Sequence, residues 1–387
     1  MLKNIIKLIL SLLNKVIPKS GNKIVLYSFP DFSDNAWALY TYLIDNSNKK
    51  YKYYWFVTDP AKFRSKKLKK TYFYNSKGRF SFFVKLYHTF TSKYVFVTHM
   101  WLPIYPAKNQ NIIYLWHGSP LKKIALMDPR KPIKTVNYFS YIIGYSEKYA
   151  PIMEKSFACS SNQVLLFGNM RNDLLFEDSN VLDELGFNDT YKKIIIYMPT
   201  FKKVSGGYSD ILTEKNTETG LQIFLTKESL ISFNNFLSTK NLLFIIKLHP
   251  SEDLSVFDLT NYSNIKFLLN KDIEIKNIQL YHLLGKADAI ISDYSSVYLD
   301  YLLLNKPIGF VIDDYESYLS ARGFLFENVI SMMPGQLIRN KEQLIEFLIN
   351  LLNKTDEYEE ERLLVSTFAN KYPDNRNRER LINFLKM

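Results

Sequence analysis

After residue 20, short apolar runs alternate with longer segments of mixed polarity. Apolar runs of four to six residues between turn residues are typical of buried strands, and the longer segments fit helices. The strands expected in the first half are residues 23–28, 53–58, 72–74, 94–98, 112–116, 141–144 and 164–167. The expected helices are residues 35–45, 78–87 and 147–158. Strands alternating with helices predict an α/β domain.

The second half repeats this alternation after a polar, acidic stretch at residues 177–191. Its expected strands are residues 193–198, 243–248, 266–269, 289–292 and 308–312, and its helices 227–237, 278–286, 296–303 and 341–351. The sequence therefore predicts two doubly wound, Rossmann-type domains, at residues 20–180 and 181–375, and a C-terminal segment at 376–387. Residues 204–220 contain a Gly-Gly pair and many Ser, Thr and Asp residues, which predicts a mobile loop.

Residues 1–18 have their own pattern, because polar residues recur there at helical spacing and apolar residues fill the opposite side. This predicts an amphipathic helix that ends at Pro18. The helix is too short, and too often interrupted by lysine, to cross a bilayer core of ~30 Å. An in-plane helix attracted to anionic lipid fits best. The alternative is a helix packed on its own domain.

Charge is distributed unevenly along the chain. Residues 1–134 contain 24 Lys and Arg residues but only five Asp and no Glu, a net charge of +19, whereas the remainder carries −7. This asymmetry indicates a polyanionic partner, which could be nucleic acid, an anionic membrane or a phosphorylated substrate. The densest basic run is residues 62–70, for which a solvated surface is the alternative. The single cysteine, Cys159, excludes an intramolecular disulfide and favours a reducing, cytoplasmic location.

Residues 289–307 carry the clearest candidate for an anion site. They predict a short buried strand, a polar turn, and a helix that begins with Ser295 and Ser296. A helix N-terminus offers unpaired backbone N–H groups that suit a phosphate, and the two hydroxyls add donors. Asp293 lies at the carboxyl end of the strand, where open α/β sheets bind ligands. The alternative is an ordinary helix cap.

Two of the five histidines follow predicted central strands, one in each domain. His117 comes after the strand 112–116 and before Gly118, and His249 comes after the strand 243–248. An imidazole there can take a proton from an alcohol or donate to a phosphate oxygen. A structural role is the alternative for each. His88 and His99 flank aromatic segments and are expected to pack. His282 lies on a helix just before the serine turn, where it could support the site, but a structural role is favoured.

Several common catalytic patterns are missing from the sequence. It has no Walker A motif, no Gly-x-Gly-x-x-Gly fingerprint and no Gly-x-Ser-x-Gly elbow. Its His, Asp and Glu residues do not show metal-ligand spacing. We therefore expect neither a metal nor a cofactor held by the protein.

Six short motifs occur in a fixed order along the chain. They are Trp116-His-Gly-Ser-Pro-Leu-Lys-Lys123, Gly168-Asn-Met-Arg-Asn-Asp173, Tyr197-Met-Pro-Thr200, Lys247-Leu-His-Pro250, Ser292-Asp-Tyr-Ser-Ser296 and Arg322-Gly-Phe324. Together they resemble the CDP-glycerol:poly(glycerophosphate) glycerophosphotransferase family over roughly residues 20–375. Ser119 stands where the family more often has threonine.

The resemblance implies a GT-B-like fold, with an acceptor-side N-terminal domain, a nucleotide-binding C-terminal domain and a cleft between them. It implies transfer of an alditol phosphate from CDP-glycerol or CDP-ribitol to a hydroxyl of a polyprenyl-pyrophosphate-linked glycan, with release of CMP. Such an enzyme would act in teichoic acid synthesis at the cytoplasmic face of the membrane, without a nucleic-acid partner. The length of the chain favours single addition, as in a primase, over polymerisation.

The resemblance also implies residue roles. His117 maps to the base that acts on the acceptor hydroxyl, His249 to a group at the donor pyrophosphate, and Ser295 and Ser296 to donor-phosphate ligands. The further substrate-binding residues that we expect are Gly118, Ser119, Arg171, Thr200, Lys247, Asp293 and Arg322. Among them, Lys247 and Arg322 would neutralise the pyrophosphate leaving group.

Two other functions remain open at this point. The first is a GT-B glycosyltransferase that uses a nucleotide sugar, because the fold and the strand-end histidines would be the same. The second is a non-catalytic protein that binds polyanions through its basic first third.

Overall fold

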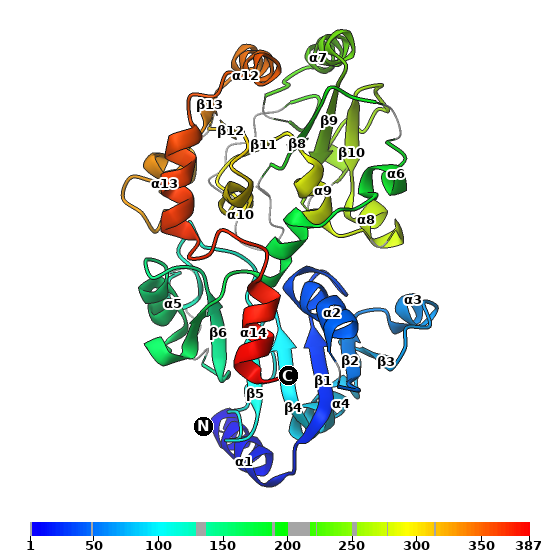
Figure 1. The fold of residues 1–387 in the computed structure, drawn as a ribbon, viewed down its shortest axis with the longest axis vertical. Coiled ribbons are helices and arrows are strands. Elements are labelled where there is room, and N and C mark those ends of the chain that lie inside the picture. Colours follow the sequence, from blue (N-terminus) through cyan, green and yellow to red (C-terminus); the bar gives the residue numbers. More distant parts are fainter. Residues whose placement is uncertain are drawn as a thin grey trace. The chain divides into compact units, whose positions relative to one another are not determined.

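The computed structural model describes residues 2–47, 49–128, 137–187, 190–199, 217–221, 223–249, 254–276, 278–312 and 315–387. The chain forms two compact units (Figure 1). Unit 1 comprises Met1–Ser119, Ile124–Leu174 and Ala369–Met387, and unit 2 comprises Pro120–Lys123 and Leu175–Phe368. The short segment Pro120–Lys123 thus belongs to unit 2, although the chain on both sides of it belongs to unit 1.

Unit 1 contains a seven-stranded sheet in the order β3-β2-β1-β4-β5-β6-β7, with every neighbouring pair parallel. Its strands are β1 (Ser20–Tyr27), β2 (Lys52–Val57), β3 (Thr71–Asn75), β4 (Ser92–Val97), β5 (Asn111–Tyr114), β6 (Tyr141–Gly144) and β7 (Val164–Leu166). Strand order reverses between β1 and β4, the switch point at which doubly wound sheets open a ligand crevice.

The helices of unit 1 lie between these strands and at both ends of the chain. They are α1 (Leu2–Val16), α2 (Asp34–Asn46), α3 (Pro60–Arg64), α4 (Ser81–Thr91), α5 (Ala150–Phe157) and α14 (Asn377–Leu385), with 3-10 turns η1 (Ala125–Met127), η2 (Ser161–Gln163) and the start of η3 (Met170–Phe176). Figure 1 shows α14, drawn in red, lying over the sheet of unit 1 beside α2. The last helix of the chain therefore completes the first unit.

Helix α1 packs on unit 1 with its polar side inward. Ser11 and Asn14 are buried, at 3% and 0% exposure. The Ser11 hydroxyl accepts from the Tyr105 N–H at 3.1 Å, and the Asn14 amide donates to Gln110 Oε1 at 2.7 Å. The apolar side faces outward and contains Ile5, Ile6, Leu8, Ile9, Leu12, Leu13 and Val16, exposed by 44–75%. Most of the apolar surface of α1 is therefore not buried within unit 1, and polar contacts of Ser11 and Asn14 attach the helix.

Unit 2 contains a six-stranded parallel sheet in the order β10-β9-β8-β11-β12-β13. Its strands are β8 (Lys193–Tyr197), β9 (Leu242–Lys247), β10 (Ile265–Leu268), β11 (Ala289–Ser292), β12 (Ile308–Val311) and β13 (Gln336–Ile338). Numbered from β8, this is the same doubly wound order as in unit 1, and its switch point lies between β8 and β11. Every residue of β9 and β11 is buried, which explains their continuous apolar runs.

The helices of unit 2 surround this sheet. They are α6 (Val181–Leu185), α7 (Lys227–Lys240), α8 (Asn270–Lys276), α9 (Leu280–Lys286), α10 (Val297–Tyr301), α11 (Tyr315–Arg322), α12 (Lys341–Asn353) and α13 (Glu359–Ala369), with 3-10 turns η4 (Leu254–Val256), η5 (Leu302–Leu304) and η6 (Ile330–Met332). A cluster of buried apolar side chains packs α7 and α12 onto the sheet.

The structure confirms two α/β units with parallel sheets, and it corrects several element bounds. The polar stretch 177–191 contains α6, so it is not simply a break between domains. The helix expected at 78–87 runs from Ser81 to Thr91, and the one expected at 296–303 begins at Val297 and continues as a 3-10 turn after Tyr301. The sequence prediction missed α3, α6, α8, α11, α13, α14 and β13. Most of the expected loop at 204–220 lies outside the described residues.

Candidate functional site

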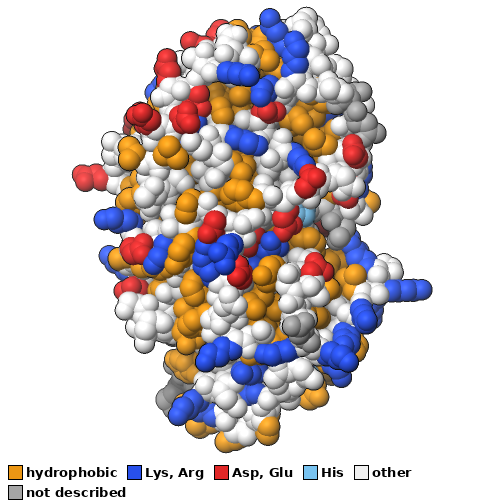
Figure 2. Space-filling model, viewed as in Figure 1, with side chains coloured by type: hydrophobic (Ala, Val, Ile, Leu, Met, Phe, Trp, Pro, Cys, Tyr) orange, Lys and Arg blue, Asp and Glu red, His pale blue; other side chains and the backbone are white. Residues whose placement is uncertain are grey.

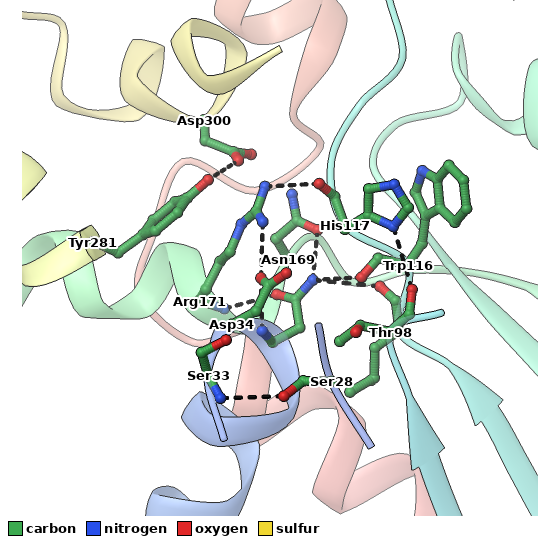
Figure 3. Close-up of polar contacts among 12 residues, drawn as sticks. Ser28, Ser33, Asp34, Thr98, Trp116, His117, Asn169, Arg171, Tyr281 and Asp300 are labelled. Carbon is green, nitrogen blue, oxygen red and sulfur yellow. Dashed lines mark hydrogen bonds and ion pairs between the residues drawn. The ribbon is translucent and has the colours of Figure 1, made fainter. Parts of the chain in front are cut away.

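The candidate residues of unit 1 gather at the carboxyl edge of its sheet, because parallel strands all end on the same side. Strand β1 ends before Ser28, β4 before Thr98 and His99, β5 before Trp116 and His117, and β7 before Gly168. Figure 3 shows how several of these side chains converge.

His117 is held as a neutral imidazole at this edge. Its Nδ1 lies 3.3 Å from the Thr98 carbonyl oxygen, which can only accept, so Nδ1 carries the proton and Nε2 has a free lone pair. Burial is the main reason that the pKa of His117 is lowered to about 4, and the charges of His99 and Arg171 add to this. Asp34 and the Thr98 carbonyl act in the opposite direction. At neutral pH His117 can therefore act as a base.

Arg171 supports the loop that carries His117. Its guanidinium forms an ion pair with Asp34 at 2.8 Å and donates to the His117 carbonyl oxygen at 3.0 Å. The side-chain oxygen of Asn35 accepts from the Arg171 N–H at 3.0 Å, and its amide donates to the Trp116 carbonyl at 3.0 Å. These contacts are drawn in Figure 3. They restrain the backbone at both Trp116 and His117.

The residues on both sides of His117 also have unusual environments. Trp116 has a φ of 54° and Gly118 a φ of 137°, so the turn requires left-handed backbone, which glycine adopts without strain. Ser119 is fully buried, and its hydroxyl makes no hydrogen bond within the described residues. The sequence identified His117, Gly118 and Ser119 from their motif, whereas Thr98, His99, Asp34 and Asn35 carried no local signal.

In unit 2, the carboxyl edge carries a cluster of positive and titratable groups formed by Lys122, Lys247 and His249, here called the cationic cluster. Lys247 is 5% exposed and donates to the Leu248 carbonyl at 2.6 Å. Burial lowers the pKa of Lys247 to about 8, and Asp272 partly offsets this. The pKa of His249 is lowered to about 4 by burial, then by the charges of Lys247 and Lys122. Lys247 and Lys122 thus both place positive charge near His249, which favours an anionic ligand.

Lys122 is the member that sequence reasoning missed. Its backbone forms an antiparallel bridge with Phe324, and the Leu325 N–H donates to the Leu121 carbonyl at 2.8 Å. Its ammonium lies 5.1 Å from the centre of the Tyr318 ring. The adjacent pair Lys122-Lys123 at the end of the first motif is the feature of the sequence that could have indicated it. Only the pairing with Phe324 reveals that this end of the motif belongs to unit 2.

The serine turn lies at the same edge, after β11. Ser292 is fully buried, and its hydroxyl has no hydrogen-bond partner within the described residues. Asp293 Oδ1 accepts from the Ser295 N–H at 3.1 Å. Ser296 stands at the N-cap of α10, but its side chain makes no capping hydrogen bond. The Asp293 contact is a local turn of the kind that a cap makes, whereas the Ser296 hydroxyl does not cap the helix. Because α10 has only five residues, its dipole adds less to anion binding than the sequence suggested.

Two of the expected site residues lie wholly or partly outside the described residues. Thr200 lies outside the described residues, and Arg322 ends α11 with its side chain outside them. In the described parts of the chain, no three His, Cys, Asp or Glu side chains gather as metal ligands would. His282, expected to pack, lies 3.0 Å from Glu177 and forms an ion pair with it when protonated.

Known proteins resemble this chain in sequence and in fold. The chain is 29% identical to the teichoic acid glycerol-phosphate primase of Bacillus subtilis over 315 residues, 78% of this chain and 75% of that one. It is also 29% identical to a teichoic acid poly(glycerol phosphate) polymerase of Bacillus spizizenii over 384 residues, 91% of this chain and 88% of that one. The crystallised wall teichoic acid polymerase TagF, H548A variant, has the same fold, with a TM-score of 0.76 at 21% identity over 100% of this chain and 95% of that one.

The profile of one protein family covers nearly the whole sequence. Residues 9–386 match the family described as CDP-Glycerol:Poly(glycerophosphate) glycerophosphotransferase. The expectation drawn from the six motifs is thereby confirmed. The chain belongs to the CDP-glycerol:poly(glycerophosphate) glycerophosphotransferase family and is a transferase.

Proposed function

We propose that this protein transfers glycerol phosphate from CDP-glycerol to a hydroxyl of a lipid-linked glycan and releases CMP, in teichoic acid synthesis. Its family and relatives support the coarser activity, transfer of an alditol phosphate from a CDP-alditol. Glycerol is favoured over ribitol because the two relatives compared above are both named for glycerol phosphate.

In the proposed reaction, Nε2 of His117 takes the proton from the acceptor hydroxyl. The acceptor oxygen then attacks the phosphorus that carries glycerol. The bond from that phosphorus to the bridging oxygen of the pyrophosphate breaks, and CMP leaves with the electron pair. Because phosphoryl transfer depends mainly on positioning and charge stabilisation, the protein must supply cations at the leaving group.

The cationic cluster is the observation that carries this proposal. Lys122 and Lys247 both act on the pKa of His249, and Lys247 is almost fully buried. Asp272 offsets the cost of burying the Lys247 ammonium only in part, and a pyrophosphate would offset more of it. His249 is neutral at pH 7 in the free protein, which favours a role as hydrogen-bond donor to the donor phosphates. The Ser292 hydroxyl and the serine turn offer further donors at the same edge.

This proposal assigns the acceptor to unit 1 and the donor to unit 2. Arg171, Gly118 and Ser119 would then support or contact the acceptor side, whereas Asp293, Ser295, Ser296, Thr200 and Arg322 would serve the donor. The cleft expected between the two domains stays a prediction, as do these residue roles.

We also propose that α1 attaches the protein to the cytoplasmic face of the membrane. In the described residues, no helix is long and apolar enough to cross a bilayer. The exposed apolar side of α1 could enter the lipid interface, while the basic first third of the chain attracts anionic headgroups. Figure 2 shows Lys and Arg side chains gathered around α3, whose last three residues begin the basic run 62–70.

A donor panel tests the proposed function. Purified protein is incubated with a lipid-linked disaccharide and with CDP-glycerol, CDP-ribitol or UDP-sugars, and products are identified by mass spectrometry. We expect turnover with CDP-glycerol. Turnover with UDP-sugars alone would instead support the nucleotide-sugar glycosyltransferase.

Two histidine variants test the site. His117→Asn should lower kcat by about 10²–10⁴-fold, the usual contribution of a general base, with donor affinity retained. His249→Ala should weaken donor binding measured by calorimetry, and His282→Gln provides the control. If both site variants keep full activity while charge reversal of residues 66–70 abolishes it, a polyanion-binding function is the better explanation.

A further inference from the structure

A second imidazole lies face to face with the proposed base. The ring centres of His99 and His117 are 4.5 Å apart, and their planes differ by 6°. A second aromatic ring is also close, because the centre of the Trp116 ring system lies 3.8 Å from that of His117, with the two planes tilted by 37°. The imidazole of His117 is therefore confined by two neighbouring rings.

Thr98 connects the two imidazoles. Its carbonyl oxygen lies 3.3 Å from Nδ1 of His117, and its hydroxyl lies 2.9 Å from Nδ1 of His99. Thr98 is itself fully buried, and its N–H donates to the Tyr27 carbonyl of β1 at 3.1 Å. One rigid residue at the switch point of the sheet thus fixes the same nitrogen on both rings.

We propose that His99 is a positioning residue for the His117 base, an inference that rests on the proposed function. A neutral imidazole that exposes the wrong atom cannot take the acceptor proton. Stacking against His99 restricts rotation of the His117 ring, while the Thr98 carbonyl selects the orientation that leaves Nε2 free. Both contacts are made by the protein's own residues, which is what preorganisation of a base requires.

The stacked pair also affects protonation. The groups that act on His117 are His99 after β4, Asp34 on α2, Arg171 on η3 and the Thr98 carbonyl. Burial lowers the pKa of His99 as well, and Asp34 opposes this. Two imidazolium rings 4.5 Å apart repel one another, so the two histidines titrate as a coupled pair. A proton on His99 therefore disfavours a second proton on His117.

The experiment compares His99→Phe, which keeps an aromatic face but removes the charge and the Thr98 contact, with His99→Ala, which removes the stack. Histidine ring signals of the full-length protein, labelled with ¹³C at histidine, are followed by NMR from pH 8 to 3.5, and His117→Asn assigns the His117 signal. Steady-state transfer is measured over the same range. His88→Phe is the matched control, because His88 is another buried histidine of unit 1 with a pKa of about 4.

We expect the pKa of His117 to rise in both variants, because His99→Phe removes a like charge and His99→Ala also admits water. The acidic limb of kcat/KM should move to higher pH with it. His99→Ala should lose about tenfold or more in kcat with donor KM unchanged, and His99→Phe should recover most of that loss. His88→Phe should leave the limb in place. Thr98→Val, which removes only the hydroxyl, gives a second test if His99→Ala does not fold.

The inference is overturned if the His117 pKa is the same in wild type and His99→Phe and if His99→Ala keeps wild-type kcat. The proposed function fails separately, if His117→Asn keeps full activity. The NMR titration requires no turnover, so it distinguishes these two failures.

Discussion

Lys247 shows at the scale of one residue how burial prepares a site for an anion. Its ammonium is almost entirely withdrawn from water, and its pKa falls to about 8 as a result. The residue is therefore mostly charged at pH 7, but it is easier to deprotonate than a surface lysine. An anionic ligand stabilises the charged form, so ligand binding and protonation are coupled.

We predict that affinity for CDP-glycerol falls above pH 8. Below this pH the ammonium is already present, whereas above it binding must also take up a proton, so the dissociation constant rises up to tenfold per pH unit. Calorimetric titrations between pH 7 and 9.5 measure the effect. Lys247→Met should bind more weakly with little pH dependence, and Lys240→Met, at an exposed position on α7, should behave as wild type. A wild-type affinity that stays constant across this range would contradict the prediction.

At the scale of elements, the motif at residues 168–173 attaches the last helix, α14, to the rest of unit 1. The buried Asp173 carboxylate accepts from the Asn377 and Arg378 N–H groups, both at 3.0 Å, and from Arg378 Nε at 2.9 Å. It therefore satisfies the first turn of α14, whose N-cap residue, Arg376, makes no capping hydrogen bond with its side chain. The Asn169 carbonyl oxygen accepts from the Asn377 amide at 3.0 Å. The motif thus has a structural role besides carrying Arg171.

We predict that Arg378→Met destabilises unit 1 by about 3 kcal/mol, because it leaves a buried carboxylate without its cation. Burial already raises the pKa of Asp173, and Arg378 opposes that shift. The matched control is Arg376→Met, which breaks an exposed ion pair with Glu379 and should leave the stability of unit 1 almost unchanged.

Urea denaturation followed by tryptophan fluorescence measures this cost selectively. All four tryptophans, at positions 37, 55, 101 and 116, belong to unit 1. Equal midpoints for the two arginine variants would show that the buried pair does not stabilise unit 1.

At the scale of the whole molecule, charge and exposed apolar surface occur in the same part of the chain. Residues 1–134 carry a net charge of +19 and include α1 with its outward apolar side. Attraction to anionic headgroups acts over about 10 Å at moderate salt and brings the protein to the surface, whereas apolar burial holds it there.

We predict that the double variant Ile9→Ser, Leu12→Ser reduces binding to vesicles with anionic lipid at least tenfold, because two exposed apolar side chains lose their burial in lipid. Flotation assays measure it. Ile231→Ser, at a position of similar exposure on α7, is the control and should bind as wild type. Wild-type binding should also weaken between 50 and 500 mM NaCl, roughly as screening increases. Unchanged binding of the double variant would indicate that α1 only packs on unit 1 and does not attach the protein to the membrane.

Sequence alone predicted the central strands of both units and placed His117 and His249 at strand ends. This succeeds because parallel strands buried on both faces require continuous apolar runs, and the residues after those runs reach the carboxyl edge. The short helices α3 and α6 and the last two helices were missed, since tertiary contacts such as those of Asp173 stabilise them more than local pattern does.

Tertiary structure decided which residues meet. His99 and His117 are 18 positions apart in sequence and stack only because β4 and β5 are neighbours in the sheet. Lys122 joins the cationic cluster through its pairing with Phe324. Helical periodicity predicted two faces for α1, but not that Ser11 and Asn14 would face inward. Periodicity determines which residues share a face, whereas the rest of the fold determines which face is covered.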